Sequence, residues 1–215
     1  MLYLQDLCYH PAATVTPILT NINLELAPRE LGVIIGASGS GKTTLLEILA
    51  GLAEPTAGKI MWRDRQLTDL ELQQLAGLVF QFPERHFCGG TILEELRLGH
   101  PELSSARVKE ALSEVGLDRI SLSTSPNALS GGQQRRLALA VQLIRQPNIL
   151  MLDEPTAGLD WSMKSQLAKL LSKLKEHWML LVVTHDPGEL VEIADRCWTI
   201  DRGELKQVAA AAMGK

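Results

Sequence analysis

A run of nine residues near the start of the chain has the composition and spacing of a phosphate-binding loop. Its glycines permit a tight turn in which backbone N–H groups and the positive end of a helix dipole converge on phosphate oxygens. Lys42 is placed to reach the β- and γ-phosphates of a nucleotide, and the Thr43 hydroxyl to bind the accompanying magnesium ion. The predicted nucleotide-binding residues are Gly36, Ala37, Ser38, Gly39, Ser40, Gly41, Lys42, Thr43 and Thr44.

The residues on either side of this loop predict the strand and the helix that must hold it. The apolar run at residues 31–35 is typical of a buried strand, and Leu45, Leu46 and Leu49 follow the loop with helical spacing. Strand, glycine-rich turn and helix come in the order of a P-loop. We therefore expect the nucleotide site where this strand ends and the helix begins.

Two carboxylates follow a second apolar run. Asp153 and Glu154 come directly after residues 149–152, which are typical of a buried strand. Because the carboxyl ends of parallel strands meet at one edge of a sheet, both side chains are expected beside the P-loop. We predict that Asp153 holds magnesium, directly or through water. Glu154 is then the general base that orients and deprotonates the attacking water.

Two further polar residues each end a predicted apolar strand. The imidazole of His185 could contact the γ-phosphate from the same sheet edge. The neutral amide of Gln81 can bind magnesium or water through its oxygen. The predicted catalytic residues are thus Glu154, His185, Gln81 and Lys42. The predicted metal ligands are Thr43, Gln81 and Asp153.

A second anion-binding device lies later in the chain. Residues 129–133 read Leu-Ser-Gly-Gly-Gln and begin a strongly helical stretch that ends before Pro147. They offer a hydroxyl and two backbone units without side chains at a helix start. The two devices are compatible with two ligands, or with one nucleotide held between two copies of the protein, each giving one device to each site. Spacing alone does not choose between these arrangements.

Composition places the chain among globular proteins with a full core. Its 215 residues are 46% hydrophobic and 21% charged. A net charge of −4 argues against a general basic surface, so no nucleic-acid partner is expected. Cys8, Cys88 and Cys197 form no CxxC pair, which suits a reducing cytoplasm. We find no bilayer-spanning apolar run and no export signal, so any membrane-spanning part should belong to another chain.

Strands and helices alternate along the chain, with one helical insert. The predicted strands are 2–9, 18–26, 31–35, 59–62, 77–80, 149–152, 179–183, 198–200 and 205–208. The predicted helices are one after the P-loop ending at Gly51, others at 69–74, 162–176 and 187–194, one that ends at Arg145, and those of the insert at 81–125.

These motifs together resemble the nucleotide-binding subunit of ATP-binding cassette (ABC) transporters, over nearly the whole chain and in the family's order. The Leu-Ser-Gly-Gly-Gln pentapeptide is the family signature. The resemblance assigns Walker A to Gly36–Thr44, the Q-loop to Gln81, the signature to Leu129–Gln133, the Walker B strand to Ile149–Asp153 with Glu154 next, the D-loop to Ala157–Asp160, and the switch histidine to His185.

The resemblance implies an α/β fold. A P-loop NTPase core would combine a RecA-like, mostly parallel sheet with an antiparallel β subdomain, and an α-helical subdomain would carry the signature. The chain is then a single ABC ATPase domain over residues 1–215. Its core is expected at 1–81 and 147–208, its helical subdomain at 82–146 and a tail at 209–215.

The family works as a head-to-tail pair of such domains that encloses two ATP molecules, with Mg²⁺, between them. ATP closes the pair and hydrolysis releases it; the partner is either a second identical copy or a related ATPase. Tyr9 looks like the aromatic residue that stacks on adenine, and Tyr3 is the alternative. The residues expected to complete the partner's site in trans are Ser130, Gly131, Gly132, Gln133 and Asp160.

The segment Gln81–Phe87 lies where core and helical insert meet. In the family this junction docks the coupling helix of an integral-membrane subunit. The sequence of this segment looks most like that of the energy-coupling-factor (ECF) type of vitamin and metal-ion importer, although His86 stands where that group has glutamine. Exposure of Phe82 and Phe87 together would favour docking, whereas burial would make them local core.

The resemblance implies an ATP-hydrolysing subunit that drives import of a small solute, such as a metal ion or vitamin, through a separate transmembrane subunit. It would be cytoplasmic and peripheral on the inner face of the membrane. The alternative is a soluble ABC ATPase without a permease, of the repair or iron-sulfur assembly type. The single cassette and the short insert favour transport by fold-level analogy.

Overall fold

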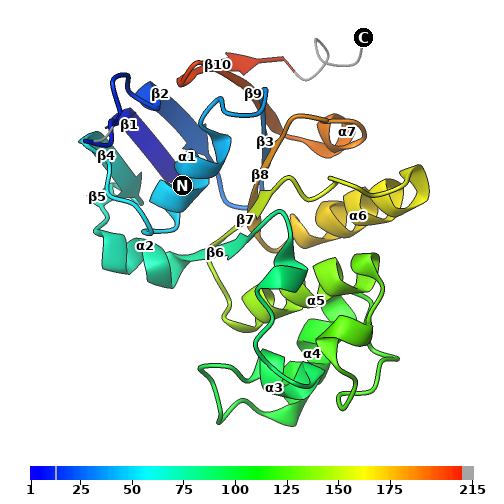
Figure 1. Ribbon diagram of the computed structural model, residues 1–215. Helices are drawn as coiled ribbons and strands as arrows, with labels where there is room; N and C mark the ends of the chain where they lie inside the picture. Colours follow the sequence, from blue (N-terminus) through cyan, green and yellow to red (C-terminus); the bar gives the residue numbers. More distant parts are fainter. Residues whose placement is uncertain (13, 210–215) are drawn as a thin grey trace.

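The computed structural model describes residues 1–12 and 14–209, which form two sheets with helices between and beside them (Figure 1). The antiparallel sheet has the strand order β2-β1-β4-β5. Its strands are β1 (Leu2–Tyr9), β2 (Leu19–Leu26), β4 (Ala57–Trp62) and β5 (Arg65–Gln66). The larger sheet has the order β10-β9-β3-β8-β7-β6 and is parallel except for β10. Its strands are β3 (Leu31–Ile35), β6 (Ala76–Val79), β7 (Ile149–Asp153), β8 (Met179–Thr184), β9 (Arg196–Asp201) and β10 (Glu204–Val208). The predicted α/β class is confirmed.

Four neighbouring strands of the larger sheet end at one edge, and this fixes where the site lies. Ile35 of β3 pairs with Thr184 of β8, and Asp153 of β7 pairs with Val183 of β8. Every residue of β7 and β8 is buried, as expected for parallel strands covered on both faces. The residues that follow β3, β8, β7 and β6 therefore emerge side by side.

Two hydrophobic cores cover the two faces of the larger sheet. Helix α1 (Lys42–Leu49) lies between the sheets, and its leucines share a core with residues of β1, β7 and β8 (Figure 1). The opposite face packs against α6 (Trp161–Leu174), α7 (Leu190–Ile193) and the helical segment. Burial on both faces holds the strand ends rigidly, and with them the loops that follow.

The helical segment falls inside the range predicted for the helical subdomain, residues 82–146. Its longest helix, α5, packs against α3, α4 and strand β6, so it joins the core of the larger sheet. Serine and threonine caps start these helices by accepting a backbone N–H bond. The elements are η1 (Pro83–Arg85), α3 (Ile92–Leu96), α4 (Ser105–Glu114), η2 (Pro126–Ala128) and α5 (Gly131–Ile144).

Strand β5 is absent from the sequence-based prediction. Arg63 and Asp64 both have positive φ values, 48° and 65°, which is the backbone of a tight hairpin turn. This turn pairs two further residues with β4. Helix α2 (Asp69–Leu75) follows and starts at a Thr68 capping box, one residue longer than predicted at its end.

Two later helices lie where they were predicted, but their observed ends differ from the approximate bounds. Helix α6 begins at Trp161 because the Asp160 side chain accepts a hydrogen bond from the backbone N–H of Met163, and it ends at Leu174. Helix α7 is much shorter than the predicted range 187–194, since Gly188 has a φ of 41° and keeps the preceding residues out of the helix. Residues 210–215 of the predicted tail lie outside the described residues.

Candidate nucleotide-binding site

The P-loop and the residues after three neighbouring strands line one cavity of about 450 Å³. Its volume is within the usual range for small-molecule sites. The structure thus brings together the four predicted catalytic residues, which sequence analysis took from segments far apart in the chain. The lining residues are Ile18, Ser38, Gly39, Gly41, Lys42, Thr43, Thr44, Gln81, Glu154 and His185.

The P-loop needs glycine for two different reasons. Gly39 and Gly41 have φ values of 79° and 103°, in the left-handed region that glycine adopts without strain. At Gly36 space is the limit, because an added Cβ would lie 2.5 Å from the Ile200 carbonyl oxygen and 2.7 Å from Ser40 Oγ. The loop is therefore packed tightly against β9, which fixes the backbone N–H groups expected to meet phosphate.

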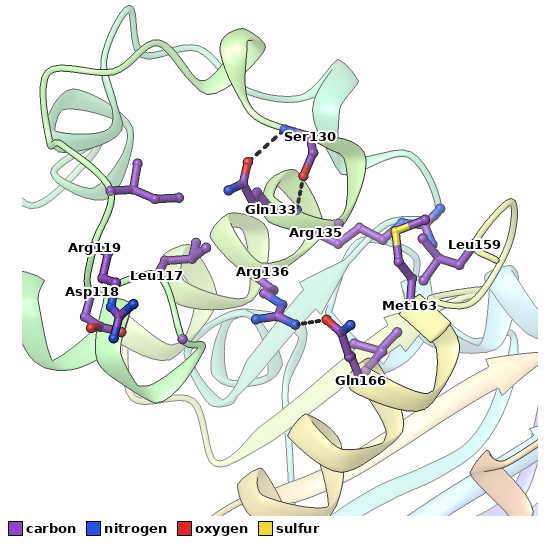
Figure 2. A pocket seen from close by; sticks show the side chains of 14 residues that line it. Leu117, Asp118, Arg119, Ser130, Gln133, Arg135, Arg136, Leu159, Met163 and Gln166 are labelled. Carbon is purple, nitrogen blue, oxygen red and sulfur yellow. Dashed lines mark hydrogen bonds between the residues drawn. The ribbon is translucent and has the colours of Figure 1, made fainter. Parts of the chain in front are cut away.

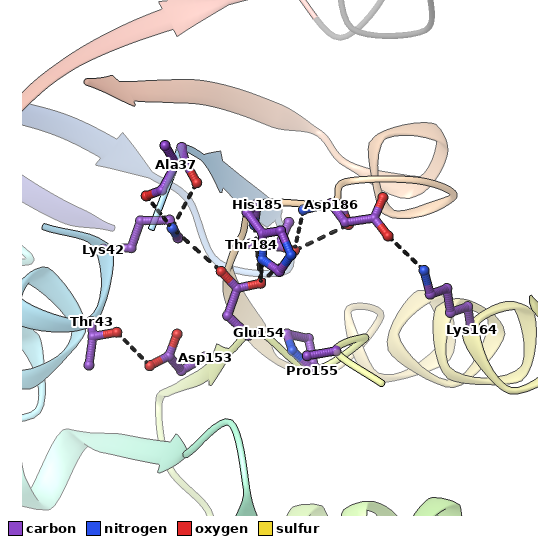
Figure 3. A network of polar contacts seen from close by, with 12 residues as sticks. Ala37, Lys42, Thr43, Asp153, Glu154, Pro155, Lys164, Thr184, His185 and Asp186 are labelled. Carbon is purple, nitrogen blue, oxygen red and sulfur yellow. Dashed lines mark hydrogen bonds and ion pairs between the residues drawn. The ribbon is translucent and has the colours of Figure 1, made fainter. Parts of the chain in front are cut away.

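The ammonium group of Lys42 is held by the loop itself. Nζ donates to the carbonyl oxygens of Gly36 and Ala37 at 2.7 and 2.9 Å (Figure 3). It also lies 3.4 Å from Glu154 Oε1, and the Lys42 side chain is only 5% exposed. A buried ammonium needs such partners. The structure thus places Lys42 in the phosphate cradle, paired with the predicted base.

Asp153 and Thr43 form a second pair beside the cradle. Thr43 Oγ1 donates to Asp153 Oδ2 at 2.7 Å (Figure 3). The other carboxylate oxygen, Oδ1, is buried and has no hydrogen-bond partner among residues 1–12 and 14–209. Burial raises the pKa of Asp153, and the hydrogen bond from Thr43 opposes this shift. An orphaned carboxylate oxygen beside a hydroxyl fits the oxygen ligands that Mg²⁺ prefers.

The Glu154 carboxylate is buried and is held by contacts with Thr184 and His185. Its Oε2 accepts hydrogen bonds from Thr184 Oγ1 at 2.9 Å and from the His185 backbone N–H at 3.1 Å, and lies 2.8 Å from His185 Nδ1 (Figure 3). Its φ of 46° is in the left-handed region, which is strained for a residue with a side chain. The predicted base and the switch histidine therefore form one unit at the end of β7 and β8.

The signature residues lie on a different cavity. Ser130 caps α5 by accepting the Gln133 backbone N–H, and Gln133 Oε1 accepts the Ser130 backbone N–H (Figure 2). With Gly132 they line a cavity of about 680 Å³ that shares no lining residue with the P-loop cavity. Asp160 is exposed and caps α6. One chain thus does not bring its signature and its P-loop together.

The two tyrosines considered for adenine stacking lie at opposite ends of β1. Tyr9 packs partly against the core, and its carbonyl oxygen accepts the Ile18 backbone N–H at 2.8 Å. Tyr3 donates its hydroxyl to Met1 Sδ. Neither lines the P-loop cavity, whereas Ile18 does. Sequence analysis missed Ile18 because an isolated apolar residue before a strand carries no motif.

The docking segment does not expose its two phenylalanines together. Phe82 is 39% exposed, with the Arg85 guanidinium 4.7 Å from the centre of its ring. Phe87 instead packs against the core that α5 shares with the sheet. Of the two alternatives left open by the sequence, exposure holds for Phe82 and local core for Phe87, and the short helix η1 lies between them.

Arg135, which lines the signature cavity, is a further residue that sequence analysis missed. From the first turns of α5 it donates to the carbonyl oxygens of Pro155 and Ala157, one and three residues after Glu154. An arginine in a helix resembles an ordinary surface residue in sequence, so no signal identified it. The structure thereby ties the signature helix to the segment that follows the predicted base.

No helix within the described ranges is long and apolar enough to cross a membrane.

The family model "ABC transporter" matches residues 19–157. The chain is 44% identical over 215 residues to ABC transporter I family member 11, chloroplastic, of Arabidopsis thaliana, covering 93% of this chain and 77% of that protein. It is 39% identical over 199 residues to the energy-coupling factor transporter ATP-binding protein EcfA2 of Symbiobacterium thermophilum, covering 87% and 69%.

Two solved structures are similar to this chain in both fold and sequence. That of cbiO1 from Clostridium perfringens, part of the ABC transporter complex cbiONQ, has a TM-score of 0.90 at 27% identity and covers 98% of this chain and 89% of that chain. The dimeric ATP-binding cassette MJ0796, bound to ADP and Pi, has a TM-score of 0.81 at 30% identity, with 98% and 99% covered.

Proposed function

Because the chain belongs to the ABC transporter family and is one of its ATPases, we propose that it is the nucleotide-binding subunit of an importer that drives a separate transmembrane subunit. The ECF transporter protein EcfA2 and cbiO1, part of the cbiONQ complex, support this proposal. The transported solute is then small, such as a metal ion or vitamin, as the ECF resemblance implies. The subunit works on the cytoplasmic face of the membrane through its partner.

One observation carries the proposed chemistry: Lys42, Gln81, Glu154 and His185 line a single cavity. ATP binds there, and Lys42 exchanges the carbonyl oxygens of the loop for the β- and γ-phosphates. Glu154 orients the attacking water and takes its proton, while His185 contacts the γ-phosphate and holds the Glu154 carboxylate.

The remaining ligand contacts are assigned from the same geometry. Thr43 and Asp153, with Gln81 beside them, would hold Mg²⁺, which neutralises charge on the β- and γ-phosphates. Tyr9 would stack on adenine, since its backbone is bonded to Ile18 at the cavity. We prefer Tyr9 to Tyr3, which lies at the other end of β1.

The second half of each site comes from a partner ATPase. The exposed positions of Ser130 and Asp160, away from the P-loop cavity, support a head-to-tail pair in which each partner supplies its signature and D-loop to the other's nucleotide. The dimeric cassette MJ0796 supports the same arrangement. Closure on ATP converts nucleotide binding into movement of the helical segment.

This arrangement predicts that ATP joins two chains only when Ser130 keeps its small side chain. In a Glu154→Gln background, which slows hydrolysis, ATP with magnesium should shift the protein to a dimer in size-exclusion chromatography. Ser130→Arg should abolish that shift while each monomer still binds ATP, because the arginine fills the space of the partner's γ-phosphate.

Ser104→Arg is the matched control, because Ser104 is also an exposed helix cap but lies on α4. Both substitutions remove a cap and should cost about 1 kcal/mol of stability. The Ser104 variant should still dimerise. Dimerisation of the Ser130 variant to the same extent would refute the trans site.

A membrane partner is proposed to dock on the segment Gln81–Phe87, where Phe82 is exposed beside Arg85. Tagged protein purified from membranes in mild detergent should bring an integral-membrane protein with it. Phe82→Asp should weaken this association, whereas Leu70→Asp, at an exposed leucine of α2, should not. Wild-type protein that recovers no integral-membrane protein would favour the soluble ABC ATPase instead.

A further inference from the structure

We propose that Arg135 is a positioning residue that fixes the catalytic turn after Glu154 relative to the signature helix, and so links the two half-sites within one subunit. The inference rests on the proposed roles of Glu154 and Ser130. It assigns to Arg135 no contact with nucleotide. Its effect on hydrolysis would come from where it holds the turn.

The contacts of Arg135 are made to backbone, and they span two parts of the fold. Nη1 donates to the Pro155 carbonyl oxygen at 2.7 Å, and Nη2 donates to the Ala157 carbonyl oxygen. Figure 2 shows the side chain extending from α5 towards the segment that carries Leu159. A guanidinium presents its donors in a rigid planar fork, so it can hold two carbonyl groups in one orientation.

The turn that Arg135 holds is the one that aims the predicted base. Glu154 has a φ of 46°, and the Ala157 backbone N–H donates to the Glu154 carbonyl oxygen at 3.1 Å. Strained backbone of this kind persists only where surrounding contacts determine it. Two charged hydrogen bonds to the carbonyl groups of Pro155 and Ala157 are contacts of this kind.

The other end of the link is the signature. Arg135 lies on the same helix as its cap Ser130, five positions along the chain, and helices transmit displacement as rigid bodies. Helix η1 of the docking segment packs against α5, and its Glu84 acts on the same guanidinium. Burial lowers the pKa of Arg135, and the negative charge of Glu84 opposes that shift. The signature helix and the catalytic turn therefore meet at this side chain, and the docking segment packs against the same helix.

This geometry predicts a loss of turnover without a loss of nucleotide binding. Arg135→Ala should lower kcat about 10- to 100-fold, because small misplacements of a catalytic group have effects of this size. The Kd for ATP, measured by titration calorimetry, should stay within about two-fold, since the P-loop is untouched. Arg135→Lys should restore turnover only in part, because an ammonium cannot bridge both carbonyl groups in one plane.

Two comparisons separate positioning from a general structural role. Arg145→Ala removes an arginine that donates to the Gln73 carbonyl oxygen from the other end of α5, and its kcat should match wild type. Guanidinium at millimolar concentration should raise the kcat of Arg135→Ala several-fold, whereas an equal concentration of sodium chloride should not. A merely structural loss would give no such rescue.

The proposal is overturned if Arg135→Ala keeps wild-type kcat, if its ATP affinity falls in parallel with kcat, or if guanidinium gives no rescue. Glu154→Gln tests the proposed function separately. If that variant is inactive and Arg135→Ala is not impaired, the base assignment stands and only the positioning role fails. If Glu154→Gln keeps full turnover, the base assignment fails whatever Arg135 does.

Discussion

The P-loop cavity and the signature cavity differ in how their polar groups are satisfied. Lys42 and Glu154 are buried and bonded to other parts of the same chain before any ligand arrives. Ser130 and Asp160 are exposed, and among residues 1–12 and 14–209 their side chains bond only to the first turns of their own helices. In the proposed function the first is a preformed binding site, and the second is a surface that becomes a site only when a partner subunit covers it.

The difference follows from the cost of burying charge. A buried ammonium or carboxylate needs a partner within the fold. These partners orient the side chains of the P-loop cavity before a ligand binds. An exposed hydroxyl or carboxylate can bond to water at little cost. An exposed signature is therefore stable in a single chain, and under the proposed function it gains its ligand contacts only when a second subunit covers it.

The largest effect is expected from a substitution that disables the P-loop cavity and leaves the signature cavity unchanged. Glu154→Gln should lower the rate of phosphate release at least about 100-fold, because an amide cannot accept the proton of the attacking water. ATP binding should remain, since an amide oxygen can still accept the bonds from Thr184 and the His185 backbone. Steady-state phosphate release and an ATP titration measure the two properties. Unchanged turnover would show that Glu154 is not the base.

A smaller effect is expected at Asp153, whose buried Oδ1 has no hydrogen-bond partner among the described residues. Burial raises the pKa of Asp153, so the folded protein holds this proton more tightly than the unfolded chain does. Its ionised form therefore lowers stability as pH rises above the ordinary aspartate range. In EDTA at neutral pH, Asp153→Asn should raise the free energy of unfolding by roughly 1 kcal/mol.

The same substitution should remove most of the extra stability that magnesium adds in the presence of ATP, because asparagine is a neutral and weaker ligand. Denaturant melts with and without magnesium would measure both effects. If magnesium stabilises variant and wild type equally, Asp153 is not a metal ligand.

The last comparison takes one glycine from each half and concerns stability alone. Gly36→Ala should destabilise the protein by about 1–3 kcal/mol, because its Cβ would meet the Ile200 backbone oxygen. Gly131→Ala should be neutral or stabilise α5 by up to about 1 kcal/mol, since among the described residues nothing beyond its chain neighbours and the backbone of its own helix lies within 4 Å of an added Cβ. Thermal melts of the two variants without nucleotide would check this contrast. Equal destabilisation would mean that the signature is as tightly packed as the P-loop.

The sequence by itself determined the class of fold and the chemistry. Buried parallel strands need continuous apolar runs, and a phosphate cradle needs glycine, lysine and threonine at fixed spacing, so both leave local patterns. The carboxylates after β7 and the histidine after β8 followed from the rule that parallel strands end at one edge. The helix ends at Trp161 and Leu190 were less well predicted, because a single cap or a glycine with positive φ decides them.

The tertiary structure decided the order in which these residues lie along that edge, and which further side chains reach them. The order β3-β8-β7-β6 places Gln81, Glu154 and His185 around one cavity, and strand order is not encoded in any short segment. The inward turn of Phe87 and the reach of Arg135 to Pro155 depend in the same way on elements far apart in sequence. Local sequence patterns determine secondary structure and motif chemistry because these depend on residues close together in the chain. A contact between residues far apart in sequence forms only when the helices and strands that carry them pack together.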